Sequence, residues 1–120
     1  MSNSVDILYE KKIFEKSINM KKINLWMSKL FNELDINDSL CSVFFTTTKT
    51  IKDLNSQYLN RDYSTDVLSF SQIEGEKINF INSNFLGDIV ICVPYAEKQA
   101  IEKNHTLLYE MFELGYSILG

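Results

Sequence analysis

Apolar residues along this chain follow two patterns, short continuous runs and positions spaced three and four apart. The continuous runs are rich in β-branched and aromatic residues and predict four β-strands, over residues 5–8, 40–48, 66–72 and 85–93. The last run, FLGDIVICV, is apolar on both of its faces and therefore predicts a central strand that is buried from both sides. Residues 71–84 carry charge, glycine and asparagine and predict an irregular loop.

Helical spacing occupies much of the remaining sequence. Apolar residues from Ile23 to Leu34 lie three and four apart and predict a helix over residues 17–33. Thr50, with Asp53 three residues later, resembles a capping box and predicts the start of a second helix. We expect the aromatic residue of that second helix, Tyr58, to be in the core.

Two further helices are predicted near the C-terminus. Pro94 suits the first turn of a helix that ends near Asn104, because its missing N–H is not needed there. Thr106 predicts the N-cap of a last helix, which reaches the end of the sequence. Strands interleaved with helices predict an α+β fold, in which helices pack against a mixed sheet.

Composition predicts one domain in a reducing compartment. The 120 residues are 45% hydrophobic and include one proline and four glycines, which predicts a single compact domain without a flexible linker. Neither a signal peptide nor an apolar run long enough to span a bilayer is visible, so we expect a cytoplasmic protein without a membrane partner. Cys41 and Cys92 lie in apolar strand-like runs and are expected to be buried free thiols, with a single disulfide as the less favoured alternative.

Charge gives no support to a strongly basic nucleic-acid-binding face. The net charge is -4, whereas phosphate binding requires clustered lysine and arginine. A net charge averaged over the whole chain does not exclude a local cleft lined by basic residues.

Few residues are suited to metal or nucleophilic chemistry. A hydrolytic zinc site needs about three ligands, and the chain has one histidine, His105, which we expect to be a capping or surface residue. The two cysteines have no evident histidine partner. Gly87, alone in a strand, predicts a bulge or a close backbone approach.

Two carboxylates stand out because an ionised side chain in a strand requires partners. Asp66 and Asp88 lie at or inside predicted strands, where they either make turn and strand-end hydrogen bonds or belong to a site. The residues alone therefore predict a mixed α/β domain with a polar cluster at one edge of its sheet.

The stretch LNSQYLNRDYSTDVLSF, residues 54–70, resembles the YbeY family of metal-dependent endoribonucleases that act in ribosomal RNA maturation. Matching elements are Leu54-Asn55, Tyr58, Asp62 and the run Thr65-Asp66-Val67-Leu68-Ser69-Phe70. A second block, FLGDIVICVPYAEKQA, is similar to the family's Leu-Gly-Asp-Ile strand and its Gln-Ala helix. The resemblance implies a four-stranded mixed sheet with helices packed on it, over one YbeY-like domain that spans residues 1–120.

The resemblance also identifies positions where this chain departs from the family pattern. The family's metal ligands are three histidines in a final helix and the loop after it, and the first ligand position falls on Ser117. The sequence ends at Gly120, before the other two positions, so we expect a domain truncated at the metal-binding helix. The family's phosphate-binding arginine corresponds to Leu59, and Arg61 lies two positions later.

The resemblance implies a single-strand-specific endoribonuclease of 16S rRNA 3'-end maturation and ribosome quality control. We expect Thr65 and Asp66 in its cleft, and Asn55, Arg61 and Asp88 in contact with RNA or protein partners. The alternative for Asn55 is a local turn or cap hydrogen bond. Zinc is the family's cofactor, but we expect no metal ligands, no zinc and no RNA cleavage in this chain.

The alternative is a catalytically inactive RNA- or ribosome-binding module. In either case the partners implied by the family are ribosomal RNA and small-subunit ribosomal proteins or assembly factors. A fortuitous motif match in an unrelated α/β protein is the least favoured hypothesis, since two long blocks occur in the family's order.

Overall fold

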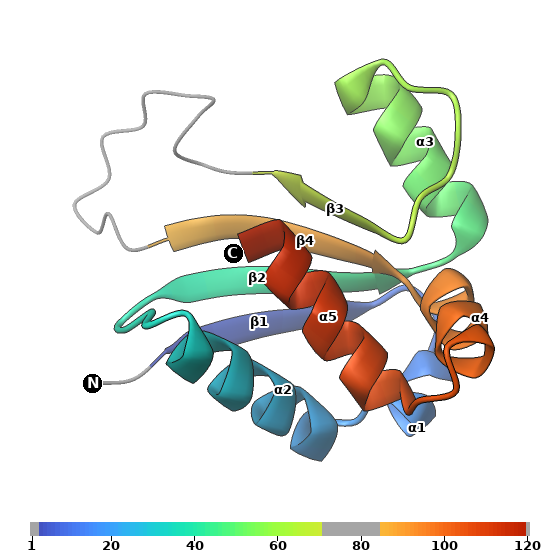
Figure 1. Cartoon of the computed structure of the whole chain (residues 1–120). Helices are drawn as coiled ribbons and strands as arrows, with labels where there is room; N and C mark the ends of the chain where they lie inside the picture. Colours follow the sequence, from blue (N-terminus) through green and yellow to red (C-terminus); the bar gives the residue numbers. More distant parts are fainter. Residues whose placement is uncertain (1–2, 71–84, 120) are drawn as a thin grey trace.

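The computed structural model describes residues 3–70 and 85–119 and shows a four-stranded mixed sheet with helices packed on it (Figure 1). The strands are β1 (Ser4–Tyr9), β2 (Leu40–Thr46), β3 (Val67–Phe70) and β4 (Phe85–Cys92). The helices are α1 (Phe14–Ser17), α2 (Met20–Glu33), α3 (Thr48–Leu59), α4 (Val93–Glu102) and α5 (Leu107–Leu119). This architecture confirms the predicted fold class. The loop predicted over residues 71–84 lies outside the described residues.

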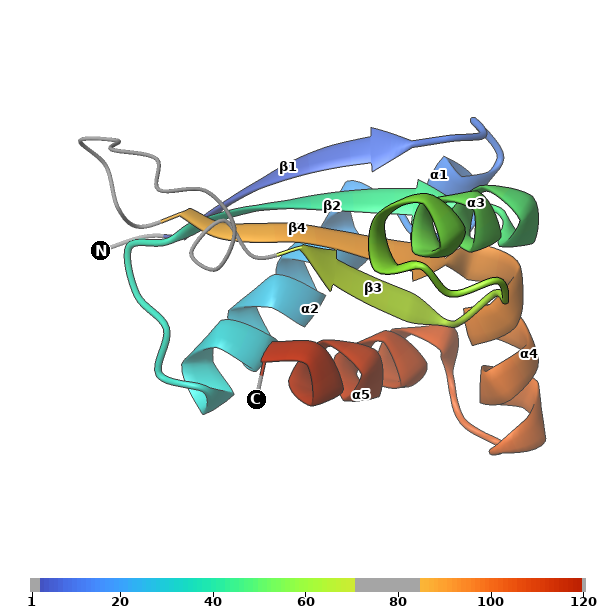
Figure 2. The same cartoon turned by 90° about the horizontal axis from the view of Figure 1, so that it is seen from above.

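The strands are arranged in the order β1-β2-β4-β3, as Figure 2 shows from above. β1 and β2 are parallel, β2 and β4 are parallel, and β3 runs antiparallel to β4. β4 therefore has a neighbour on each side, as its apolar sequence predicts. Gly87 lies at a bulge with φ of 132°, since Leu40 pairs with Phe85 but Cys41 pairs with Gly87. This conformation favours glycine and confirms the expected irregularity.

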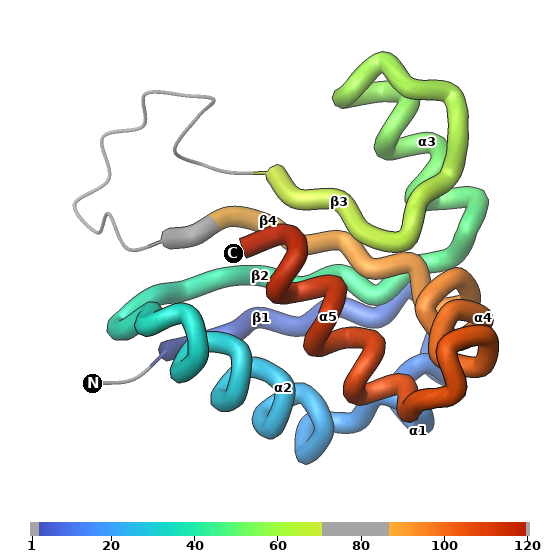
Figure 3. The backbone as a smooth tube through the Cα atoms, in the orientation of Figure 1, coloured from blue at the N-terminus to red at the C-terminus, as the bar shows by residue number. Residues whose placement is uncertain are grey.

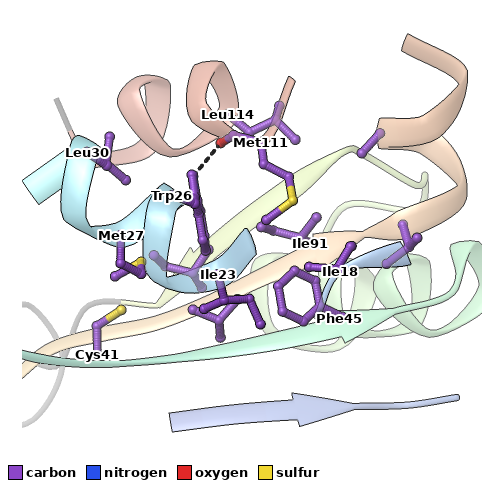
Figure 4. Close-up of a cluster of buried hydrophobic side chains, with 14 of the residues drawn as sticks. Ile18, Ile23, Trp26, Met27, Leu30, Cys41, Phe45, Ile91, Met111 and Leu114 are labelled. Carbon is purple, nitrogen blue, oxygen red and sulfur yellow. Dashed lines mark hydrogen bonds between the residues drawn. The ribbon is translucent and has the colours of Figure 1, made fainter. Parts of the chain in front are cut away.

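The main core lies between the sheet and the layer that contains α2 and α5, two helices that lie side by side (Figures 1 and 3). The indole Nε1 of Trp26 in α2 donates a hydrogen bond to the carbonyl oxygen of Met111 in α5 at 2.8 Å (Figure 4). Gly115 permits this close approach, because a Cβ atom there would lie 2.5 Å from Cδ2 of Leu30. Gly115 thus sets how closely α2 and α5 pack together over the core.

Helix starts differ from the sequence-based expectations in two places. The N-cap of α3 is Thr47 rather than Thr50, and the Thr47 hydroxyl accepts a hydrogen bond from the Thr50 N–H. The physical reason is that Thr47 already has the extended backbone of a capping residue, so Thr50 lies inside the first turn. In addition, α2 begins at Met20 behind an Asn19 cap, and a separate one-turn helix, α1, precedes it.

In the described part of the chain, α3 covers only part of the second face of the sheet (Figure 2). α3 packs there on a smaller cluster of buried side chains, Ile51, Leu68, Val90 and Cys92. Figure 2 shows that α3 overlies the end of the sheet and leaves much of β1 and β2 uncovered. This uncovered face contains the site described below. Of the helices in the described part of the chain, none has the length and apolar character needed to cross a bilayer.

Candidate functional site

A groove of about 730 Å³ occupies the uncovered face of the sheet beside α3. Strand register builds its floor, because Asp6, Ser42 and Asp88 are aligned across β1, β2 and β4. Phe70 of β3 extends the same row, since it pairs with Asp88. Sequence segments more than 30 residues apart therefore meet in one line across the sheet.

The groove has an acidic floor. The Ser42 hydroxyl donates a hydrogen bond to the half-buried Asp88 carboxylate, and Asp6 is exposed. Burial first, and then the charges of Asp88 and Asp6, raise the pKa of the nearby Cys41 thiol to about 12. None of the eleven described residues that line the groove is basic. The groove is thus suited to hydrogen-bond donors and does not by itself attract phosphates.

Two aromatic rings form one wall of the groove. Tyr58 from the last turn of α3 and Phe70 pack edge to face, with centroids 5.8 Å apart and planes at 72°. Tyr58 is 63% exposed, so its predicted place in the core is wrong. The reason is that Tyr58 continues the apolar stripe of Ile51 and Leu54 into the last turn of α3, where the helix overhangs the open groove. An exposed ring above a sheet is a surface on which a planar ligand can stack.

The predicted cleft residues Thr65 and Asp66 do not line this groove. The Cys92 N–H donates to the Asp66 carbonyl oxygen, and the Thr65 hydroxyl donates to the Asp66 carboxylate at 3.3 Å. Asp88 lies four residues before Cys92 on β4, which separates it from the Asp66 end of the sheet by about 13 Å. Asp88 and the Thr65-Asp66 pair are therefore at opposite ends of β3.

The structure also places the other predicted residues. Asn55 is fully buried, and its amide donates to the Tyr63 carbonyl oxygen at 2.9 Å, so it holds the chain after α3 and does not face a ligand. Arg61 is exposed just beyond the C-cap of α3, and its backbone N–H donates to the Asn55 carbonyl oxygen. Leu59 is the last residue of α3, and Ser117 is exposed on α5.

A second polar cluster joins α4 to α5. His105 Nε2 lies 2.6 Å from Oε1 of the fully buried Glu110, so the prediction of a capping or surface histidine is wrong. The physical reason is that the chain between the helices turns His105 inward against the buried carboxylate. The local signal for the burial of Glu110 is its position on the apolar face of α5, next to Met111 and four residues before Leu114.

This cluster contains a set of potential metal ligands. One atom each from His105, Glu110 and Glu113 lies within 4.8 Å of the others, and imidazole and carboxylate are ligands that zinc accepts. However, Lys103 Nζ lies 3.5 Å from Oε1 of Glu110 and 3.5 Å from Oε1 of Glu113. Burial lowers the pKa of Lys103, but the two glutamates outweigh this and leave the pKa raised, so the ammonium form is favoured. The donor set therefore fits an ion-paired cluster with its own cation better than an open zinc site.

Comparisons with known proteins agree with this fold. The family profile described as Endoribonuclease YbeY matches residues 7–116. Among curated relatives, Endoribonuclease YbeY of Sulfurihydrogenibium sp. (strain YO3AOP1) is 34% identical over 108 residues, which is 90% of this chain and 69% of that protein. Endoribonuclease YbeY of Persephonella marina is 38% identical over 96 residues, which is 80% of this chain and 61% of that protein. The chain thus spans about two thirds of the length of these relatives.

A solved structure has the same arrangement. The solution structure of a Thermotoga maritima protein matches with a TM-score of 0.59 and 28% identity. The match covers 92% of this chain and 65% of the other.

Proposed function

Because the chain belongs to the endoribonuclease YbeY family, we propose that it binds single-stranded ribosomal RNA during maturation, with bases in the groove beside α3. The observation that carries this proposal is the exposed Tyr58 ring above a floor of carboxylates. Unpaired bases stack on aromatic side chains, and carboxylates accept hydrogen bonds from base amino groups. The site of action would be the cytoplasm, where such RNA is processed.

The proposed activity of residues 1–120 is RNA binding without metal-assisted cleavage. The His105 group already contains the Lys103 ammonium, and His105 is the only imidazole in the sequence. When bound in a family member, zinc would supply an activated water and stabilise charge on the phosphate. Stoichiometric zinc that a chelator removes together with ribonuclease activity would contradict this part of the proposal.

A second candidate function is binding to a basic segment of a ribosomal protein or assembly factor. It is favoured by the two carboxylates, Asp6 and Asp88, in a groove without a described basic side chain. A lysine or arginine flanked by apolar residues would match both the charge and the apolar walls.

Fluorescence anisotropy with a labelled single-stranded RNA tests the first candidate. We expect Tyr58→Ala to weaken binding about tenfold, since stacking of a base contributes about 1–3 kcal/mol. The matched control is Tyr95→Ala, which removes a partly exposed tyrosine of α4 outside the groove. Equal affinity of both variants and the unmodified chain would contradict base binding in the groove.

Asp88→Asn separates the two candidates. A basic peptide loses its ion pair and should bind at least tenfold more weakly to this variant. A base can still donate to the amide oxygen of asparagine, so RNA affinity should change less. Strong binding of a basic peptide together with no RNA binding would favour the second candidate.

A further inference from the structure

A positively charged surface lies between the end of β1 and the first turn of α2. Five of the 12 basic residues of the chain fall in residues 11–22, which contain one acidic residue, Glu15. These five are Lys11, Lys12, Lys16, Lys21 and Lys22, and we call them the lysine platform. Their concentration contrasts with the net charge of -4 of the whole chain.

Most of the platform charge is available to a ligand. Lys11, Lys12, Lys16 and Lys21 are exposed. The four ion pairs between described residues involve Lys49, Lys103 and His105, and none of the platform lysines. Lys22 differs, because its Nζ donates to the Ser17 carbonyl oxygen at 2.9 Å.

The backbone that carries these lysines is held in place. Phe14 and Ile18 are buried in the main core, and the Tyr9 hydroxyl donates to the Ile18 carbonyl oxygen at 2.6 Å. A hollow of about 490 Å³ is lined by Lys12, Ile13, Glu15 and Lys16. The backbone of the platform is thus fixed, which lowers the entropy lost when a ligand binds, and two of its lysines, Lys12 and Lys16, border a hollow.

Its position complements the acidic groove. Leu8 of β1 lines the groove, and Lys11 follows three residues later in the chain, so the platform begins where β1 leaves the groove. The groove offers carboxylates and aromatic rings but no described basic group, and so it cannot neutralise a polyanion. A strand whose bases occupy the groove requires cationic contacts elsewhere.

We propose that the lysine platform binds the phosphates of an RNA strand that continues from the groove past the end of β1. The proposal rests on the proposed function and adds the surface that supplies its phosphate contacts. An anionic membrane suits the platform less well. Interfacial helices need a long apolar face, whereas α1 has four residues and the exposed apolar side chains nearby are Ile13 and Met20.

The test compares two triple variants with the same change in charge. The platform variant is K11Q/K12Q/K16Q, and the control K49Q/K52Q/K98Q removes three exposed lysines of α3 and α4. Affinity for a labelled 20-nucleotide single-stranded RNA is measured at several salt concentrations. We expect the slope of log K against log salt to fall in magnitude by about 2 for the platform variant, since each phosphate contact on a single strand contributes about 0.7. The control should keep the slope of the unmodified chain.

Each result has a defined meaning. Equal slopes for all three proteins, or equal loss in both variants, would overturn the platform proposal while RNA binding itself stands. If the unmodified chain bound no RNA, the proposed function would fail as well. Sedimentation with phosphatidylserine vesicles is the second measurement. Platform-dependent vesicle binding without a change in RNA binding would overturn the proposal in favour of a membrane surface.

Discussion

Oε1 of Glu110 lies 2.6 Å from Nε2 of His105. Glu110 is fully buried, whereas the other described carboxylates are at least partly exposed to solvent. Lys103 approaches the same oxygen at 3.5 Å, and Oε2 of Glu110 has no hydrogen-bond partner among the residues that the structure describes. A fully buried carboxylate in this setting depends on its cationic and hydrogen-bonding partners. The Glu110 carboxylate links the segment after α4 to α5 and so fixes the position of α5.

We therefore expect Glu110→Gln to lower the free energy of unfolding by about 3 kcal/mol, as when one partner of a buried ion pair is removed. The control is Glu113→Gln, which alters a carboxylate that is 43% exposed and should cost less than about 1 kcal/mol. Urea denaturation measures the free energy of unfolding of both variants. Equal midpoints for the two variants would show that the buried pair contributes no more than a surface contact.

Glu10 should make stability depend on pH. Partial burial alone raises the pKa of Glu10, but hydrogen bonds from Thr46, Thr47 and Thr50 outweigh it and leave the pKa below its ordinary value of 4.5. A lowered pKa stabilises the folded state above the unfolded pKa, and this contribution is lost as pH falls through the folded value. Because Glu10 is exposed and solvent screens its contacts, Glu10→Gln should destabilise the chain by less than about 1 kcal/mol at pH 7.

Measuring the free energy of unfolding of both proteins at lower pH tests whether the Glu10 carboxylate causes this destabilisation. The difference between Glu10→Gln and the unmodified chain should be constant above about pH 5.5 and shrink below pH 4.5. Glu15→Gln, which alters an exposed residue of α1, is the control for removal of one negative charge. A difference that stays constant down to pH 3 would exclude the carboxylate as its source.

The strands and most helices of this fold could be predicted from the sequence because their signals are local. A continuous apolar run identified β4 as central, and Thr106 caps α5 as expected, since its hydroxyl accepts from the Tyr109 N–H. By contrast, the start of α3 at Thr47 is reinforced by Glu10, 37 residues away, which no local window contains.

The groove could not be predicted for a related reason. Its floor requires the register of β1, β2 and β4, which places Ser42 beside Asp88 across 46 residues. Asp88 was identified because a charge inside a strand needs partners. Asp6 was not, because β1 is an edge strand where exposed acidic residues are ordinary. The family motif around Thr65 was found, but a motif does not specify which concavity its residues face.

Gly115 should resist substitution by alanine. A Cβ atom there would meet Leu30 Cδ2 at 2.5 Å and Trp26 Nε1 at 3.2 Å, and Leu30 is fully buried, so its side chain must shift within a packed core. Alanine favours a helix by about 1 kcal/mol over glycine, whereas overpacking a core costs about 1–3 kcal/mol. We expect net destabilisation of about 1 kcal/mol in thermal or urea unfolding, and none for Ser117→Ala, on the exposed side of the same helix. A more stable Gly115→Ala variant would show that α2 and α5 separate easily.

Cys41 should be inert in the folded protein. Burial, followed by the charges of Asp88 and Asp6, raises its pKa to about 12, so almost no reactive thiolate exists at pH 8. In a Cys92→Ser variant, iodoacetamide should alkylate Cys41 only after unfolding in urea, which mass spectrometry detects. Rapid alkylation under native conditions would show that the start of β2 opens.

Substitution of Asn55 tests whether this residue positions the turn after α3 or contacts RNA directly. Its side-chain amide donates to the Tyr63 carbonyl oxygen, and its backbone oxygen accepts from Arg61, so the residue fixes the turn that follows α3. Asn55→Ala should cost about 1–3 kcal/mol, because it removes a fully buried amide and its part-buried hydrogen bond to the Tyr63 carbonyl oxygen. Measured at 10 °C, where the folded state persists, RNA affinity should fall less than twofold, whereas Tyr58→Ala should reduce it about tenfold. A tenfold loss of affinity in a fully folded Asn55→Ala variant would place this amide in contact with RNA, and would require the turn after α3 to open when RNA binds.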